Sequence, residues 1–149
     1  MTFKQKVYSQ YLESLNDKIS LLRTTLADLK ESCSNETKST AGDKHETALA
    51  MLQIEQKNVS QQLKEALDQK VLFEQINPAI IKPEAGSGSL LKTNKGYLFL
   101  SVALGKLVVD GVPIMAISLR SLLGQKLMGL KVNDTTEVNG IQYVIESIL

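Results

Sequence analysis

The feature that most constrains this chain is a run of apolar residues spaced alternately four and three positions apart near its start. Its members are Tyr8, Leu12, Leu15, Ile19, Leu22, Leu26, Leu29 and Cys33. This spacing keeps the apolar side chains on one narrow face of an α-helix. The pattern predicts a helix over residues 3–33 that needs a partner to cover its stripe.

A second stripe of the same kind follows and predicts a helix over residues 44–76. Its positions are Leu49, Leu52, Gln56, Val59, Leu63, Ala66, Lys70 and Phe73. The two stripes mirror each other, so that Tyr8 faces Phe73 and Leu22 faces Val59. We therefore predict an antiparallel helical hairpin, about 45 Å long at ~1.5 Å per residue, with a turn between residues 34 and 43.

The pattern changes at the segment NPAIIKPEAGSGS, whose prolines and glycines end the helix and begin a linker. We place a hairpin at 1–77, the linker at 78–87 and a second domain at 88–149, which should fold on its own. Six short β-rich runs follow, separated by the turn signals NKG, DG and NG. With a short helix between Ser121 and Gly129, they predict a small antiparallel sheet and an α+β fold.

Composition narrows the function classes. The chain has 17 basic and 16 acidic residues, so its net charge gives no general attraction to nucleic acid or an anionic membrane. Its one cysteine, Cys33, continues the helical stripe, which favours a core position over a reactive thiol. We see no signal peptide and no run of ~18 apolar residues, and we expect a cytoplasmic protein without a membrane span.

Two carboxylates, Asp43 and Glu46, stand three residues apart in the stretch STAGDKHETALA, between the predicted helices. Aspartate followed three residues later by glutamate is typical of a capped helix start. Alternatively, the hairpin carries both carboxylates to a site where hard oxygen ligands hold Mg²⁺, which takes one or two carboxylates and keeps several waters. The spacing fits both interpretations.

The stretch GDKHETALAMLQIEQ resembles the tip of bacterial Gre transcript-cleavage factors, whose pattern is Gly-Asp-x-x-Glu-Asn-Ala-Glu-Tyr followed by Glu-Gln. The matching residues are Gly42, Asp43, Glu46, Ala48, Glu55 and Gln56. A second stretch, ISLRSLLGQKLMGLKVND, resembles the family's C-terminal run. There the matches are Ile117, Ser118, Ser121, Leu123, Gly124, Leu127, Gly129 and Asp134. The resemblance extends over nearly the whole chain, because the predicted parts follow the family's order.

The resemblance implies an FKBP-like C-terminal domain and a monomeric accessory factor of RNA polymerase, with no complete active site of its own. Asp43 and Glu46 would enter the polymerase's secondary channel and help to hold a second Mg²⁺ near the 3′ end of backtracked nascent RNA, whose cleavage the polymerase performs. Residues Ser121, Leu122, Leu123 and Gly124 would contact the rim of that channel. A serine that caps the short helix is an equally good interpretation of Ser121.

The chain also departs from the family pattern. Thr47 stands where the family has asparagine, Ala50 where it has tyrosine, Leu122 where it has proline and Leu130 where it has lysine. The first two departures lie beside the carboxylates and put cleavage in more doubt than polymerase binding. A regulator that occupies the channel without cleavage, or a coiled-coil adaptor unrelated to transcription, stays open. A free-standing enzyme is disfavoured because the sequence offers no nucleophile and base pair and no phosphate loop.

Overall fold

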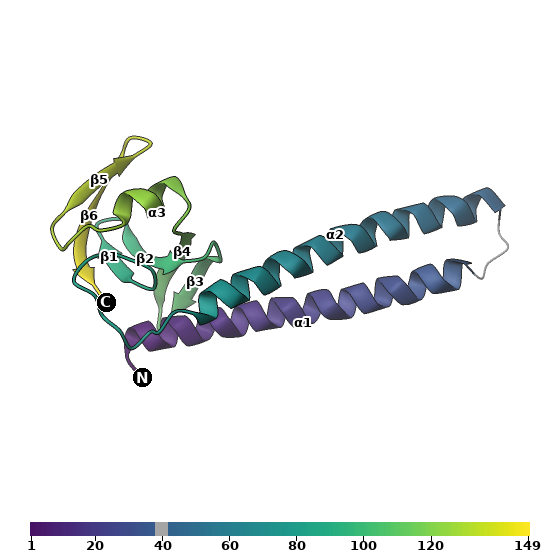
Figure 1. Ribbon diagram of the computed structural model, residues 1–149, viewed down its shortest axis with the longest axis horizontal. Helices are drawn as coiled ribbons and strands as arrows, with labels where there is room; N and C mark the ends of the chain where they lie inside the picture. The colour runs from purple at the N-terminus through teal and green to yellow at the C-terminus, as the bar shows by residue number, and fades with distance from the viewer. Residues whose placement is uncertain (38–41) are drawn as a thin grey trace. The chain divides into compact units, whose positions relative to one another are not determined.

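The computed structural model describes residues 1–37 and 42–149, and it describes side chains outside residues 36–45. Two long helices, α1 (Phe3–Thr37) and α2 (Gly42–Glu74), precede the strands (Figure 1). The strands are β1 (Leu90–Thr93), β2 (Gly96–Ser101), β3 (Gly105–Val109), β4 (Val112–Ser118), β5 (Thr135–Val138) and β6 (Ile141–Ile148), with α3 (Leu122–Leu127) between β4 and β5. The predicted α+β fold, a helical hairpin followed by a sheet with a short helix, is confirmed.

The chain divides into two compact units, and the division falls inside the long helices. One unit consists of Met1–Glu13 together with Lys70–Leu149, and the other is Ser14–Gln69. The sequence prediction instead separated a hairpin at 1–77 from a domain at 88–149. The first turns of α1 and the last turn of α2 therefore belong with the sheet, which we call the sheet unit. We call Ser14–Gln69 the hairpin unit.

Ring and side-chain contacts within each unit show that α1 and α2 run antiparallel. In the sheet unit, the rings of Tyr8 and Phe73 stack with their centroids 4.8 Å apart, as the mirrored stripes predict. In the hairpin unit, the Cys33 thiol donates a hydrogen bond of 3.5 Å to the side-chain oxygen of Gln56. Cys33 is half-buried and Leu22 and Val59 are buried, so the stripe positions along the hairpin unit face inward.

The sheet has the strand order β3-β4-β2-β1-β6-β5. Four of its neighbouring pairs are antiparallel, but β2 and β4 run parallel, which corrects the prediction of a purely antiparallel sheet. The reason is topological: β3 reverses the direction of β2, β4 reverses it again, and β4 then takes the place beside β2. Two-residue turns at Asp110–Gly111 and Asn139–Gly140 have positive φ at both positions, as tight hairpins require.

Both faces of the sheet are covered. On one face, Leu98, Leu100 and Leu91 form a buried cluster with Leu127 of α3 and with Ala85 of the linker. Phe99 points to the other face, where its ring lies 6.1 Å from that of Tyr11 and 5.9 Å from that of Phe73. The ends of the long helices therefore complete the second layer of the sheet unit.

Tyr11 ties the start of α1 to the sheet by hydrogen bonds as well as by packing. Its hydroxyl lies 2.7 Å from the carbonyl oxygen of Gly105 and 2.9 Å from that of Ile114, on neighbouring strands. Burial raises the pKa of Tyr11 to about 12, and the nearby backbone of Ala116 and Leu107 acts in the opposite direction. The neutral phenol is therefore the form that the sheet unit accommodates.

Candidate functional site

The two tip carboxylates lie in the first turn of α2. The helix begins at Gly42, so Asp43 is its second residue and Glu46 lies less than one turn further on. Residues three apart project from the same side of a helix. The side chain of Glu46 is exposed, whereas that of Asp43 lies outside the described side chains. Both positions thus lie within the first turn of α2.

The helix start bears on the capping interpretation of Asp43. A capping residue precedes the first helical residue and has a non-helical backbone. With α2 beginning at Gly42, Asp43 lies inside the helix, and the predicted start at residue 44 is two residues too late. A carboxylate in the first turn is still favourable there, because the N-terminus of a helix carries partial positive charge.

The side chain of Asp43 lies outside the described side chains, so a metal site at the tip stays a prediction. Among the residues that the structure describes, no three His, Cys, Asp or Glu side chains lie close enough to hold a metal ion. Neighbouring positions Thr47 and Ala50 are exposed, and neither residue type supplies a carboxylate. Two carboxylates supply hard oxygen ligands suited to Mg²⁺, but an ion held there needs further ligands from elsewhere.

The second candidate site is the start of α3, where Ser121 is the N-cap. Its hydroxyl oxygen accepts a hydrogen bond of 3.0 Å from the backbone N–H of Gly124, and the hydroxyl donates one of 2.6 Å to the carbonyl oxygen of Ser118. The hydroxyl thus fixes the turn between β4 and α3. The capping interpretation of Ser121 is confirmed, while its predicted contact with a partner stays a prediction.

The other three residues of this site have different surroundings. Leu123 packs against the buried cluster under α3, and Gly124 is buried. A Cβ atom on Gly124 would overlap the carbonyl oxygen of Ser118 and lie 3.0 Å from the Ser121 hydroxyl oxygen, so this turn closes only around glycine. Leu122 is 55% exposed. Of the four predicted contact residues, Leu122 is therefore the one best placed to meet a partner.

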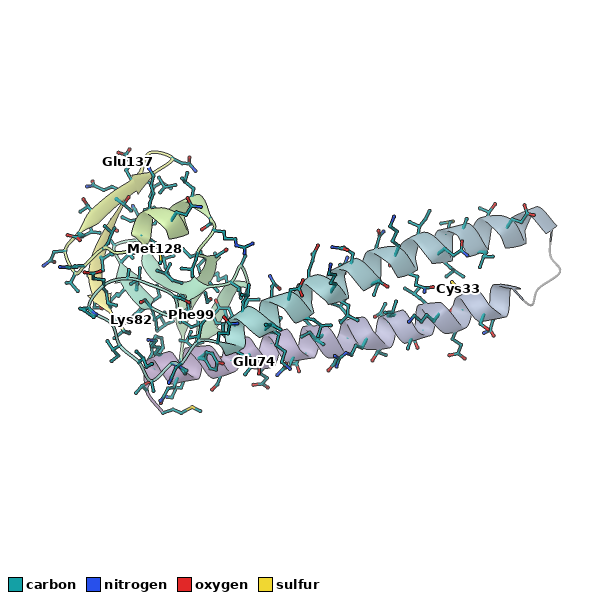
Figure 2. The ribbon with its side chains drawn as sticks, in the orientation of Figure 1. Cys33, Glu74, Lys82, Phe99, Met128 and Glu137 are labelled. Atoms are coloured by element: carbon teal, nitrogen blue, oxygen red, sulfur yellow. The ribbon has the colours of Figure 1, made fainter. Side chains whose placement is uncertain are left out.

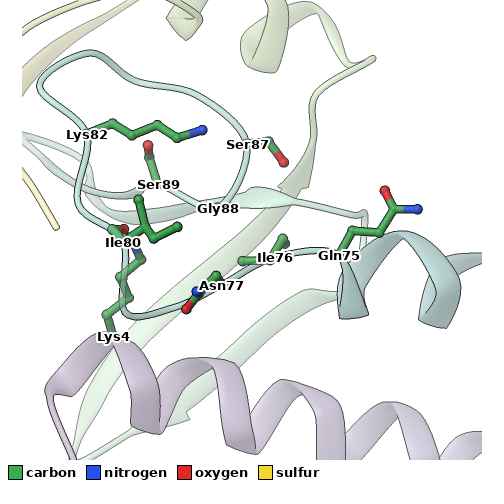
Figure 3. Close-up of a pocket in the computed structure, with 9 residues that line it drawn as sticks. All are labelled: Lys4, Gln75, Ile76, Asn77, Ile80, Lys82, Ser87, Gly88 and Ser89. Carbon is green, nitrogen blue, oxygen red and sulfur yellow. The ribbon is translucent and has the colours of Figure 1, made fainter.

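A cleft in the sheet unit, which no sequence pattern predicted, is lined by Lys4, Lys82, Ser87, Gly88, Ser89 and residues near them (Figure 3). A signal was present, because Lys4 precedes the first stripe by four positions and so continues its helical spacing. A lysine at such a position lies toward the buried face of the helix. Lys4 is 5% exposed.

Comparisons with known proteins add little to these observations. No protein-family model matches the chain, and no curated protein matches it. Among solved structures, a match is the structure of the transcription factor Gfh1, which is 16% identical to this chain. The match covers 92% of each chain with a TM-score of 0.38. A likeness of this strength does not indicate a function.

Neither long helix has the apolar length that a bilayer crossing needs, and the same holds for every other helix in the described part of the chain. Figure 2 shows side chains with nitrogen or oxygen atoms along both helices, Glu74 at the end of α2 among them.

Proposed function

We propose that this protein is a Gre-like transcription elongation factor that enters the secondary channel of RNA polymerase and stimulates Mg²⁺-dependent cleavage of backtracked RNA. The observation that carries the proposal is the start of α2. There a Gly-Asp-x-x-Glu motif has its two acidic residues three positions apart in the first turn of a helix that belongs to an antiparallel hairpin. The second Gre-like motif, around the capped start of α3, supports the same assignment.

In this proposal the protein is an accessory factor and the polymerase performs the chemistry. Asp43 and Glu46 would supply two ligands to an Mg²⁺ ion whose remaining ligands would come from the polymerase and the RNA. Such an ion makes its bound water a stronger nucleophile and stabilises charge on the scissile phosphate. The sheet unit would supply docking through the exposed Leu122, and the hairpin unit would carry the carboxylates.

The departures at Thr47 and Ala50 favour a second candidate, a regulator that occupies the channel without stimulating cleavage. Both residues lie on the exposed surface beside Glu46, where the family has an amide and a phenol that could orient water or RNA. Such a regulator would bind the polymerase equally well. The two candidates differ only in what happens to the RNA.

A cleavage assay on backtracked elongation complexes tests the proposal. Stalled complexes are incubated with the protein at limiting Mg²⁺, and transcripts shortened at the 3′ end are measured against binding to the polymerase. We expect wild-type protein to accelerate cleavage, and Asp43→Asn and Glu46→Gln to abolish the acceleration with little loss of affinity. Added Mg²⁺ should partly restore both variants, because the defect lies in ion retention.

Two control variants separate the roles of the two sites. Asn and Asp have similar helix propensities, so Asp43→Asn keeps the first turn of α2 at the cost of one favourable charge near the helix N-terminus. Leu122→Ala should weaken polymerase binding without changing stability, because its side chain is largely exposed. Full cleavage by Asp43→Asn at limiting Mg²⁺ would rule out the ion role, and binding without any cleavage by wild type would favour the non-cleaving regulator.

A further inference from the structure

The cleft noted above lies within the sheet unit and is separate from both Gre-like motifs. Its lining comes from three segments: the start of α1, the residues that follow α2, and the linker before β1 (Figure 3). Its volume is about 280 Å³. The lining residues are Lys4, Gln75, Ile76, Asn77, Ile80, Lys82, Ser87, Gly88 and Ser89. The space is large enough for a small polar ligand.

The charge of this cleft is one-sided. Two of its lining residues are lysines, and none is an aspartate or a glutamate. Lys4 is almost fully buried, and its ammonium donates a hydrogen bond of 2.6 Å to the carbonyl oxygen of Ile80. Burial, and the nearby positive charge of Lys82, lower the pKa of Lys4. The unit thus holds two cations near each other with no acidic lining residue to balance them.

Some side chains that line this cleft carry N–H protons that no acceptor in the described part of the chain takes up. The Lys4 ammonium uses one of its three protons on Ile80. The Lys82 ammonium makes no hydrogen bond or ion pair within the described part of the chain, and its side chain is exposed. Asn77 uses its carbonyl oxygen on the N–H of Ala79, which leaves its amide protons. The lining therefore offers hydrogen-bond donors to a ligand.

The linker is held firmly in the shape that presents these donors. The Ser89 hydroxyl oxygen accepts a hydrogen bond of 3.0 Å from the N–H of Gly86, and Gly88 donates one of 2.7 Å to the carbonyl oxygen of Leu100. A Cβ atom on Gly88 would lie 2.8 Å from the methyl Cγ2 of Ile76. Glycine at this position lets the serine loop approach the segment after α2, so the cleft is a built feature of the fold.

We infer that this cleft binds a phosphoryl group, as inorganic phosphate or as the phosphomonoester of a small molecule. A phosphate dianion matches the two lysines in charge, and its several acceptor oxygens match the ammonium, amide and hydroxyl donors. Lys82 and Lys4 would contact the anion from the linker and from α1, with Ser87 and Ser89 beside it. This site is independent of the proposed action on RNA polymerase.

The test is a titration of the full-length protein with inorganic phosphate at constant ionic strength, monitored by two-dimensional NMR spectra of the backbone amides. We expect saturable shifts of the amide signals of Ser87 and Ser89. Lys82→Gln should weaken the affinity by about tenfold, because it removes a charge-assisted hydrogen bond. Lys92→Gln, which removes an exposed lysine of β1 outside this cleft, should bind phosphate as the wild type does.

Further arms of the experiment identify the ligand and guard against misfolding. Glycerol 3-phosphate binding more tightly than phosphate would indicate a phosphomonoester site, and equal affinities would indicate a site for the phosphate group alone. Lys82 is exposed, so its variant should keep the wild-type amide spectrum elsewhere. Shifts that rise linearly without saturation, or equal affinities for wild type and Lys82→Gln, would overturn the inference.

Discussion

The junction of the long helices with the sheet makes a strong prediction for Phe73→Ala. The Phe73 ring is fully buried and has three aromatic neighbours, Tyr8, Tyr11 and Phe99, with centroids 4.8 to 6.5 Å away. Truncation of a buried phenylalanine typically costs about 3–5 kcal/mol in free energy of unfolding. We expect about 4 kcal/mol, because the cavity would lie between two helices and a strand and leave three rings without their partner.

Urea denaturation followed by tyrosine fluorescence measures this loss selectively. The chain has no tryptophan, and all four of its tyrosines lie in the sheet unit. Circular dichroism at 222 nm, recorded in parallel, reports mainly the long helices. Val71→Ala is the matched control, because Val71 lies two residues earlier in α2 and is 61% exposed. It should change the free energy by less than about 0.5 kcal/mol.

The reasoning would be refuted if Phe73→Ala lowered the free energy of unfolding by less than about 1 kcal/mol, or if Val71→Ala cost as much. Either result would mean that the helix ends merely touch the sheet and do not belong to its core. A large loss seen by tyrosine fluorescence, with little change in the helical signal at low urea, would agree with a division of the chain inside α1 and α2.

Two further predictions concern the same unit. Since the pKa of Tyr11 is about 12 in the folded protein and about 10 when unfolded, its contribution is fully present below pH 10 and is lost as pH rises toward 12, by about 1.4 kcal/mol per pH unit. The urea midpoint should therefore fall less between pH 8 and pH 11 for Tyr11→Phe than for wild type, and equal falls would contradict the assignment. Gly124→Ala should lower the stability by about 1–3 kcal/mol, because the added methyl group overlaps the Ser118 carbonyl oxygen. An unchanged thermal midpoint in calorimetry would show that the turn before α3 adapts.

The strands could be predicted closely because their ends are marked by local chemistry. The turns at Asp110–Gly111 and Asn139–Gly140 need positive φ, which Asn, Asp and Gly tolerate, so the sequence itself carries those boundaries. The parallel pairing of β2 with β4 has no such local mark. It depends on which strand fills the place beside β2, and that choice is made by long-range packing.

The heptad pattern also did not predict which residues at the start of α1 are buried. The pattern placed Tyr8 and Leu12 in the seam, but the structure buries Val7 and Tyr11 more completely. A heptad pattern reflects packing against one partner helix, whereas these turns of α1 also pack against the sheet. The segment YLFLSVAL held a clue, because its apolar residues do not alternate, and such strands are covered on both faces.

At the tip, the spacing of Asp43 and Glu46 could predict only that they share a side of the helix. An aspartate and a glutamate three positions apart satisfy a helix start and an ion with equal ease. At Ser121 the local rule was sufficient, because a cap is a contact between near neighbours. The cleft at Lys4 and Lys82 joins residues far apart in the chain, so no local motif could reveal it.

The bonds from Tyr11 to Gly105 and Ile114 have a consequence for how the protein is made on the ribosome. They join residues 94 and 103 positions apart, so the first segment to be synthesised cannot find its partners until most of the chain has emerged. The intervening helices can pair in the meantime, because their contacts are nearer in sequence. The N-terminal turns of α1 would then be among the last to dock. A ribosome that stalls before β4 is synthesised would leave the Tyr11 side chain exposed to water.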